Sequence, residues 1–558
     1  MKSLKVAICT LNSKYIHSSL APWYLKAAIE ANCPRNIVVS VLEGTINDDL
    51  SSIANEIIAL NPDIIGFSCY IWNIIATKKL VRMLKDHINP IIVLGGPEVS
   101  FNPRETLESE PHIDFIISGE GEKPFSLLVS AICNQSDYTD IPGLCYKDKG
   151  KIYIKKPYFT TDTPPSPYND EYFKKLNGRL AYLETSRGCP FSCAFCLSGN
   201  CGNVRFFDIE RTKSEIIKLG NSGAKTIKLV DRTFNCNRKR AYELFKFIIE
   251  NYGSAIPQGA CFHFEIAGDL LDEQTIRLLS TAPAGLIQFE IGLQSLNPKT
   301  LEAIQRKTDI CKLLGNIRKL LKPENIHIHI DLIAGLPFED LQSFRKSFNT
   351  AFSLKPHMLQ LGFLKLLHGS QMRENSEKYP CKFSPEPPYE VIETPWITHN
   401  ELKLLHFTED ALDRLYNSGR FRRTLNYVLT ETEKTPFDIF SEFGEYTANQ
   451  TSSIALDDYI ELVYNFFCEK YKLNNTVLRD VMACDRLATN ASGSLPQVLR
   501  IKDPSLKQKI KAFERQTPQL KGVQRGYAYL YSQNRLVYAD YKDKHPVTGE
   551  YQITKVEL

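Results

Sequence analysis

The sequence predicts an α/β protein with three parts: an N-terminal Rossmann-like, doubly wound domain, a central partial TIM barrel of the (β/α)6 type, and a mainly helical C-terminal domain. Three observations lead to this fold class. Short apolar runs alternate with amphipathic stretches over residues 1–140, the alternation returns with a longer period over 179–370, and helical patterns replace it over 371–558. A chain of 558 residues is also too long for one hydrophobic core.

The N-terminal domain is expected to contain a parallel sheet, because its apolar runs are short and separated by helical stretches. Helices are predicted between the strands, for example over 51–60 and 74–88. The candidate strands are 5–10, 37–43, 64–69, 91–96 and 114–119. Residues 141–178 then supply a connection, in which alternating runs around DKGK predict a β-hairpin over 143–156 and a Pro- and Thr-rich stretch predicts an extended linker over 158–170.

The central region is expected to form the barrel, whose chemistry would lie at the carboxyl ends of its strands. Helices are predicted over 211–223 and 237–253. The candidate strands are 180–186, 226–231, 262–268, 286–293, 327–336 and 358–367. In the C-terminal region we expect an ordered loop over 384–396, helices over 398–417, 452–471 and 505–516, and a small hairpin in the last forty residues.

Composition excludes several classes of protein. The net charge is only +4, from 68 basic and 64 acidic residues, so nothing indicates a nucleic-acid or anionic membrane partner. No apolar stretch is long enough to cross a bilayer, and the apolar run at the N-terminus is too short for a secretory signal. We therefore expect a cytoplasmic protein, in which most of the fifteen cysteines are buried hydrophobic residues and not disulfides.

Three cysteines form a cluster directly after the first candidate barrel strand: Cys189, Cys193 and Cys196. One interpretation is a structural zinc site or a closed electron-transfer cluster, with Cys201 as the fourth thiolate. The other is a [4Fe–4S] cluster held by three thiolates, whose fourth iron stays open for a substrate. The position at a barrel mouth favours the second interpretation.

At these residues the sequence resembles the radical S-adenosylmethionine (SAM) superfamily. The signature CxxxCx(aromatic)C is matched by Cys189, Cys193 and Cys196, with Phe195 as the aromatic residue. The resemblance implies that S-adenosylmethionine chelates the open iron. It also implies that an electron, from a donor such as flavodoxin or ferredoxin, splits the cofactor into methionine and a 5′-deoxyadenosyl radical. On this reading Cys201 is not a ligand.

The later motifs of the superfamily also have candidates here. The resemblance assigns Asp231 and Asn235 to the methionyl amino group, Glu265 to a ribose hydroxyl, and the turn of Gly335 and Pro337 to adenine. Glu290, Gln294 and Ser295 are further cofactor-binding candidates. Local roles stay open beside these: the carboxylates could bond to neighbouring strands, and Asp231 and Asn235 could stabilise turns or caps.

The N-terminal domain resembles the cobalamin-binding domain of one large subgroup of this superfamily. In an open α/β sheet, ligands bind at the carboxyl edge of the strands, and glycines there allow a bulky ligand to approach the backbone. The residues that carry this resemblance are Ser68, Gly95, Gly96, Gly119, Glu120 and Gly121. His17 lacks the aspartate and glycine of the Asp-x-His-x-x-Gly motif, so we expect no histidine ligand to cobalt and a lower cobalt face that is shielded or open.

The resemblance implies a radical SAM enzyme that binds a [4Fe–4S] cluster, S-adenosylmethionine and cobalamin and methylates an unactivated carbon of a small-molecule or peptide substrate. One alternative is a cyclisation or rearrangement with the same cofactors. Another is a methylthiotransferase with a second cluster on Cys9, Cys33 and Cys69. A sensor without catalytic activity is the alternative outside the enzymes.

Overall fold

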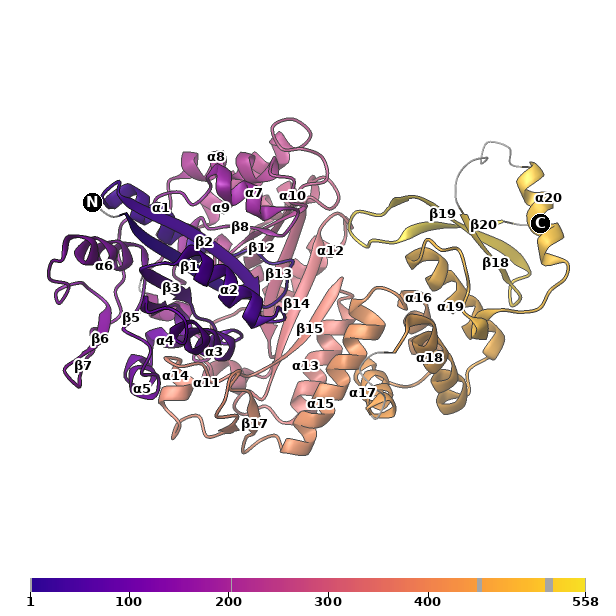
Figure 1. Cartoon of the computed structure of the whole chain (residues 1–558). Helices are drawn as coiled ribbons and strands as arrows, with labels where there is room; N and C mark the ends of the chain where they lie inside the picture. The colour runs from indigo at the N-terminus through magenta and orange to yellow at the C-terminus, as the bar shows by residue number, and fades with distance from the viewer. Residues whose placement is uncertain (1–2, 202, 449–453, 517–524, 557–558) are drawn as a thin grey trace. The chain divides into compact units, whose positions relative to one another are not determined.

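The structure, a computed structural model, describes residues 3–201, 203–448, 454–516 and 525–556 (Figure 1). The chain forms two compact units. The first comprises Met1–Leu278, Glu302–Thr308 and Leu364–Thr394, and the second comprises Leu279–Leu301, Asp309–Phe363 and Pro395–Leu558. Residues of the predicted barrel therefore belong to both units. The domain boundaries inferred from the sequence stay predictions.

A seven-stranded sheet forms the centre of the N-terminal domain, with strand order β2-β1-β3-β4-β5-β6-β7. The first five strands are parallel, and β6 and β7 add to the edge in antiparallel orientation. The predicted doubly wound sheet and the hairpin are confirmed, and the hairpin extends that sheet. The strands are β1 (Leu4–Asn12), β2 (Ile37–Thr45), β3 (Ile64–Ser68), β4 (Ile91–Gly95), β5 (Phe115–Ile117), β6 (Leu144–Asp148) and β7 (Lys151–Tyr153).

Helices cover both faces of this sheet, which explains why its strands are apolar throughout. Along β1, Val6 and Ile8 pack on one face while Ala7 and Cys9 pack on the other, as the alternation of a strand requires. The first face is covered by α1 (Ala21–Asn32) and α6 (Glu122–Asn134). The second is covered by α2 (Leu50–Leu60), α3 (Ile74–Lys85), α4 (Pro97–Ser100) and α5 (Pro103–Ser109), shown in indigo in Figure 1.

Three parallel strands of the predicted barrel complete the core of the first unit: β8 (Ala181–Leu183), β11 (Thr226–Leu229) and β12 (Cys261–Ile266). Their apolar side chains are buried on one face, and Lys228 stands in register with Tyr182 and His263 on the other. The remaining elements of this region are α7 (Asp170–Leu176), β9 (Ser186–Arg187), β10 (Arg205–Phe206), α8 (Ile209–Gly220), α9 (Arg238–Asn251), α10 (Glu273–Ser280), α14 (Gln371–Glu374), β16 (Lys382–Phe383) and β17 (Val391–Glu393).

The second unit contains the other three predicted barrel strands, which are again parallel: β13 (Ile287–Gln294), β14 (His327–Ala334) and β15 (Met358–Phe363). Burial alternates strictly along β13, where Ile287, Phe289 and Ile291 are buried and the residues between them are only partly so. One face of these strands is therefore apolar and the other carries polar side chains. The associated helices are α11 (Pro298–Ala303), α12 (Ile310–Leu321) and α13 (Leu341–Ser353).

The C-terminal region of the second unit is mainly helical, as predicted. It contains α15 (His399–Leu412), α16 (Arg422–Glu431), α17 (Pro436–Thr447), α18 (Leu456–Tyr471), α19 (Asn475–Thr489) and α20 (Leu506–Gln516). Three antiparallel strands, β18 (Arg525–Leu530), β19 (Arg535–Lys544) and β20 (Tyr551–Val556), form a sheet against α19. None of the helices in the described ranges combines the length and apolarity needed to span a bilayer.

Four expectations for residues 371–558 need correction. The predicted hairpin is a three-stranded sheet, because β20 adds to β19. The predicted loop 384–396 contains β17, which pairs with β16. The helix predicted over 398–417 ends at Leu412, and Asp413–Asn417 continues as a π-helical turn. Of the helix predicted over 452–471, residues 452 and 453 lie outside the described residues, and the helix begins at Leu456.

Candidate functional site

The three clustered cysteines lie on the loop that joins β9 to β10, after the first barrel strand. Backbone bonds fix the middle of the loop, because Ala194 donates to the Ile304 carbonyl (2.9 Å) and its own carbonyl accepts from Met372 (3.0 Å). Cys189, Cys193 and Cys196 are all free thiols, and Cys193 is buried. The sequence-based placement of the cluster loop next to the first barrel strand thus agrees with the structure.

Each of the three thiols meets a different polar group. Cys189 Sγ lies 3.4 Å from the Thr233 hydroxyl, the Ser198 amide donates to Cys196 Sγ at 3.4 Å, and Arg306 Nη1 donates to Cys193 Sγ at 3.9 Å. Burial raises the pKa of Cys193, and the neighbouring thiols Cys196 and Cys189 raise it further. Arg306 lowers it. Cys193 and Cys196 thus each accept a hydrogen bond that could stabilise a thiolate, whereas the Thr233 hydroxyl beside Cys189 donates to the Arg232 carbonyl at 2.8 Å.

This donor set fits an iron–sulfur cluster. In such a cluster each thiolate holds a different iron. Among the residues that the structure describes, no three His, Cys, Asp or Glu side chains gather closely enough to hold a single metal ion. The side chain of Cys201 lies outside the described residues, so its exclusion as a ligand stays a prediction. Phe195 is half-buried on the same loop.

Asp231 joins the carboxyl ends of two barrel strands, β8 and β11. Its carboxylate is 1 % exposed and accepts hydrogen bonds from the Thr185 amide (3.0 Å), the Thr185 hydroxyl (2.7 Å) and the Ser186 hydroxyl (2.5 Å). Burial raises its pKa, and these donors oppose the rise. Asn235 is occupied in a similar way, since its amide group bonds to both the carbonyl and the N–H of Ala267. The contacts of both residues match the local roles that the sequence left open; a contact with S-adenosylmethionine stays a prediction.

Glu265 lies on the partly exposed face of β12, where Lys228 Nζ lies 3.7 Å from its carboxylate. Tyr182 lies on the same face of β8, and its hydroxyl bonds to Nδ1 of His17 at 2.7 Å. Burial and Lys14 lower the pKa of His17. This bond links the loop of His17 to β8 and leaves Nε2 of the ring unassigned, so the absence of a histidine ligand to cobalt stays a prediction.

The second unit places its predicted residues at the carboxyl ends of β13 and β14. Glu290 lies on the polar face of β13. Gln294 adopts a left-handed backbone (φ 65°), and its buried Oε1 has no hydrogen-bond partner among the described residues. Gly335 has φ 84° in the turn that also contains Pro337, directly after β14. The unpartnered oxygen of Gln294 is the feature here that most clearly calls for a ligand.

Ser295 is engaged by a buried carboxylate that the sequence patterns did not indicate. Its hydroxyl donates to Glu339 Oε1 at 2.6 Å, and the Ser347 hydroxyl lies 3.4 Å from the same oxygen. Glu339 is 1 % exposed, and burial raises its pKa from 4.5 to about 7, while the two serines oppose the rise.

The pKa of Glu339 predicts a dependence of stability on pH. Since the folded chain keeps this proton to higher pH than the unfolded chain, the free energy of unfolding should fall as pH rises from 4.5 to about 7. Glu339→Gln keeps the shape and removes the titration, so the fall should shrink by on the order of 1–3 kcal/mol. Urea unfolding of the wild type and of Glu339→Gln across this pH window measures the free energy of unfolding. An unchanged slope in the variant would show that Glu339 is not the titrating group.

An arginine just before the cysteine loop joins that loop to the N-terminal domain. Arg187 contacts Glu184 (2.9 Å), Glu120 (3.1 Å) and Glu122 (2.5 Å). Arg205, on the paired strand β10, also contacts Glu120 at 2.9 Å. All five side chains are at most 16 % exposed. We call these residues the arginine–carboxylate network. It ties the loop after β5 to the start of the cluster loop.

This network gives Glu120 a structural partner set of two arginines, and its contact with cobalamin stays a prediction. Two of the glycines also have local structural reasons. A side chain at Gly96 (φ 104°) would place its Cβ 2.5 Å from the Cys69 carbonyl oxygen, and one at Gly119 (φ 92°) would overlap the backbone of Tyr158. The chain's own backbone therefore requires these glycines. At Gly95 the nearest atom to such a Cβ is 3.7 Å away, so that position stays open to a ligand.

Exposed apolar side chains gather on the loops at the carboxyl ends of β1 and β3, close to the buried Ser68. Tyr15, Ile16 and Trp72 are 67 %, 45 % and 47 % exposed. Trp72 stacks on Tyr70 with ring centroids 4.4 Å apart, and its indole N–H donates to the Leu11 carbonyl. We call Tyr15, Ile16, Tyr70 and Trp72 the edge patch. Ligands of open α/β sheets bind at this edge, so these side chains are candidates to contact one. The sequence offered a signal for it, namely aromatic residues directly after two apolar strands.

The thiols proposed for a second cluster do not meet. Cys9 and Cys69 pack in the core on the face covered by α2 and α3, whereas Cys33 packs on the opposite face. Burial raises the pKa of all three thiols. The sheet lies between Cys33 and the other two thiols. These three cysteines therefore cannot hold the second cluster that the methylthiotransferase alternative requires.

Three family models match the chain. The B12 binding domain matches residues 6–129, the Radical SAM superfamily matches residues 183–351, and a protein of unknown function, DUF4080, matches residues 377–538. The chain thus carries the B12-binding and radical SAM domains of cobalamin-dependent radical SAM proteins. The resemblance seen in the sequence and the predicted fold class are both confirmed.

Individual relatives agree with this assignment. The cobalamin-dependent radical SAM methyltransferase TokK of Streptomyces tokunonensis is 30% identical over 333 residues, 55% of this chain and 47% of TokK. The uncharacterized methyltransferase PH0819 of Pyrococcus horikoshii is 26% identical over 400 residues, 68% of this chain and 82% of that protein. The crystal structure of the cobalamin-dependent radical enzyme OxsB with aqua-cobalamin and S-adenosylmethionine has a TM-score of 0.61 at 13% identity and covers 92% of this chain and 81% of OxsB. The chain spans about half the length of the first curated relatives it matches.

Proposed function

We propose that the protein is a cobalamin-dependent radical SAM methyltransferase that acts on an unactivated carbon. One observation carries the proposal. A loop with three free thiols and an N-terminal B12-binding sheet belong to the same unit, and the arginine–carboxylate network joins that loop to the loop after β5 of the sheet. When bound, the cluster with S-adenosylmethionine supplies a 5′-deoxyadenosyl radical, and cobalamin supplies a methyl group.

The chain's own residues have separate tasks in this proposal. Cys189, Cys193 and Cys196 hold the cluster, and Arg306 compensates part of the negative charge of the thiolates. Asp231 keeps the loop at the mouth of β8 by holding Thr185 and Ser186. In the first unit, the polar face of β11 and β12, with Lys228 and Glu265, would bind polar groups of S-adenosylmethionine. Glu290 and Gln294, in the second unit, stay the candidates that the sequence gave.

Cobalamin binds at the carboxyl edge of the N-terminal sheet in this proposal, near Ser68 and Gly95. The edge patch would supply apolar side chains against the corrin ring. His17 is not assigned as a cobalt ligand, since it lacks the aspartate and glycine of the Asp-x-His-x-x-Gly motif.

Methyl transfer is favoured over cyclisation by the named relatives. TokK and PH0819 are both named methyltransferases. Cyclisation is the second candidate, since an anaerobic magnesium-protoporphyrin IX monomethyl ester cyclase of Cereibacter sphaeroides is 24% identical over 321 residues. We propose a small-molecule or peptide substrate, a reduced flavodoxin or ferredoxin as electron donor, and a reducing, cytoplasmic setting. All fourteen cysteines with described side chains are free, which suits such a setting.

Anaerobic reconstitution tests the proposal. The loaded protein should contain about four irons and one corrinoid per chain, and should release 5′-deoxyadenosine from S-adenosylmethionine under reductant. With a substrate in hand, methyl-deuterated S-adenosylmethionine should yield a product that carries the label; an unlabelled product of altered mass would favour cyclisation. About eight irons would restore the second cluster. Failure to cleave S-adenosylmethionine would reject an enzymatic role.

The edge patch makes its own prediction. Trp72→Ala should weaken the binding of hydroxocobalamin at least tenfold, because the stacked pair Tyr70 and Trp72 loses the apolar surface that would face the corrin. Absorbance titration measures the change. Tyr153→Ala is the matched control, since Tyr153 is a partly exposed aromatic on β7 and should leave affinity unchanged. Equal affinity in both variants would remove the edge patch from the cobalamin site.

A further inference from the structure

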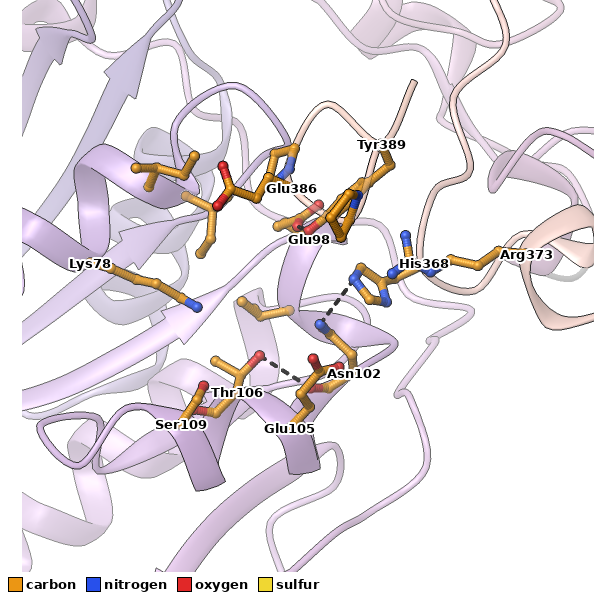
Figure 2. A pocket seen from close by; sticks show the side chains of 15 residues that line it. Lys78, Glu98, Asn102, Glu105, Thr106, Ser109, His368, Arg373, Glu386 and Tyr389 are labelled. Carbon is orange, nitrogen blue, oxygen red and sulfur yellow. Dashed lines mark hydrogen bonds between the residues drawn. The ribbon is translucent and has the colours of Figure 1, made fainter. Parts of the chain in front are cut away.

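A small pocket lies on the N-terminal domain where α3, α4 and α5 face the segment 368–389 (Figure 2). Its volume is about 200 Å³, below the roughly 300–1,000 Å³ of sites for drug-sized ligands. Cobalamin is far too large for it. None of the residues assigned above to the cluster, to S-adenosylmethionine or to cobalamin lines it.

The pocket is built by two segments that are distant in the sequence. The Tyr389 hydroxyl donates to Glu98 Oε1, and Asn102 Nδ2 lies 3.3 Å from Nε2 of His368. Gly369 (φ 83°) packs so closely on Phe101 that a side chain there would overlap the ring. The wall that contains Tyr389 falls within the match to DUF4080, so this family region completes a pocket on the B12-binding domain.

The unsatisfied groups of the pocket are hydrogen-bond acceptors. Oδ1 of Asn102 is buried without a hydrogen-bond partner among the described residues. Glu98 is 6 % exposed; its Oε1 accepts from the Tyr389 hydroxyl, its second oxygen accepts from no described residue, and the charges of Arg373 and Lys78 offset part of its own. Figure 2 shows both side chains in the middle of the pocket lining. Burial of unpaired acceptors is costly unless a ligand donates to them.

The cations near the pocket are already engaged. Arg373 donates to the Leu366 carbonyl at 2.7 Å and lies over the Tyr389 ring, and Lys78 pairs with Glu110 at 3.6 Å. Two further carboxylates, Glu105 and Glu386, line the pocket, so an anion is disfavoured. A metal ion is disfavoured as well, because the described side chains offer no set of three ligands. Ile74, Ile75 and Val99 form an apolar side.

We propose that this pocket binds a small organic ammonium ion. Its ammonium group donates to Glu98 and Asn102, and a short alkyl part packs on Ile74 and Ile75. The charge of the ligand is matched by Glu98, as the rule that buried charges are paired requires. The proposal does not depend on the radical chemistry.

Calorimetric titration of the cobalamin-loaded protein with n-butylammonium chloride tests it, with n-butanol as the neutral probe of the same shape. We expect saturable binding of the ammonium ion with one site per chain, and no comparable binding of the alcohol. Glu98→Gln keeps the shape of the side chain and should weaken binding at least tenfold. Glu108→Gln, on the exposed side of α5 and outside the pocket, is the matched control and should bind as the wild type does.

A second pocket variant keeps the test decisive if Glu98→Gln does not fold. Ile75 is 46 % exposed, so Ile75→Trp should fold normally while it fills the pocket and abolishes binding. The proposal is overturned if the ammonium ion does not bind, if butanol binds equally, or if binding survives in both pocket variants. It is also overturned if only the cobalamin-free protein binds the probe, because the pocket would then belong to the cobalamin site.

Discussion

Replacing Arg187 by alanine should lower the free energy of unfolding by about 3–5 kcal/mol, the typical cost of removing one partner from a buried ion pair. The variant leaves Glu120, Glu122 and Glu184 close together with little exposure to water. Only Arg205 remains to compensate Glu120. Because Arg187 directly precedes the cysteine loop, the same variant should also reconstitute with less iron and bind cobalamin more weakly.

The pH dependence of this loss distinguishes charge from packing. Burial by itself would raise the pKa of Glu122, but Arg187 outweighs it and the pKa lies below its usual value of 4.5. In the wild type this carboxylate therefore contributes stability above pH 4.5 that is lost as pH falls through the folded pKa. Without Arg187, burial dominates and the folded pKa of Glu122 rises. The deficit of Arg187→Ala should thus shrink as pH is lowered from about 7 towards 4.5.

Urea unfolding, iron content and cobalamin titration of the loaded protein measure these effects. Arg187→Lys should recover only part of the stability, because an ammonium group cannot contact three carboxylates with the fixed fork of a guanidinium. Arg104→Ala is the control: Arg104 pairs with Glu108 on the surface with 62% exposure and should cost less than about 1 kcal/mol. A wild-type-like stability and iron content in Arg187→Ala would show that the network does not hold the loop.

Alanine at Cys189, Cys193 or Cys196 should reduce reconstituted iron from about four to below about one per chain and abolish cleavage of S-adenosylmethionine. Each thiol has its own place on the loop and its own polar contact, so no remaining thiol can replace it. Iron analysis and electron paramagnetic resonance of the reduced protein report the loss.

Cys236→Ala provides the matched control for these variants. Burial raises the pKa of Cys236, and repulsion from the nearby Cys189 thiol raises it further. Cys236 nevertheless stands outside the motif. It should retain iron and activity, and so should Cys201→Ala. Loss of iron in Cys201→Ala would restore a four-thiolate cluster, and retention of iron in any of the three motif variants would contradict the ligand assignment.

Sequence periodicity located the parallel strands well, because strands covered on both faces are continuous apolar runs. It was poorer in the C-terminal region, where α16, α17 and α19 were not predicted. In α19 the charged side chains Arg479, Asp480 and Asp485 are buried. Arg479 pairs with Asp480 at 2.7 Å, and Asp485 pairs with Arg423 of α16 at 3.2 Å. Charged residues that are buried as ion pairs occupy positions on the inner face of a helix that would otherwise be apolar. Hydrophobic periodicity therefore does not reveal such a helix.

Local patterns were sufficient for the class of this protein: three cysteines at a set spacing after an apolar strand, and glycines at strand ends of a β/α domain. Both are short-range signals that do not depend on the rest of the chain. The roles of Glu120, Gly96, Glu339 and Glu98 became clear only from the folded chain. Each is defined by a partner distant in the sequence: Arg187, the Cys69 backbone, Ser295 and Tyr389. Such contacts form when packing brings separate segments together, and no sequence spacing encodes them.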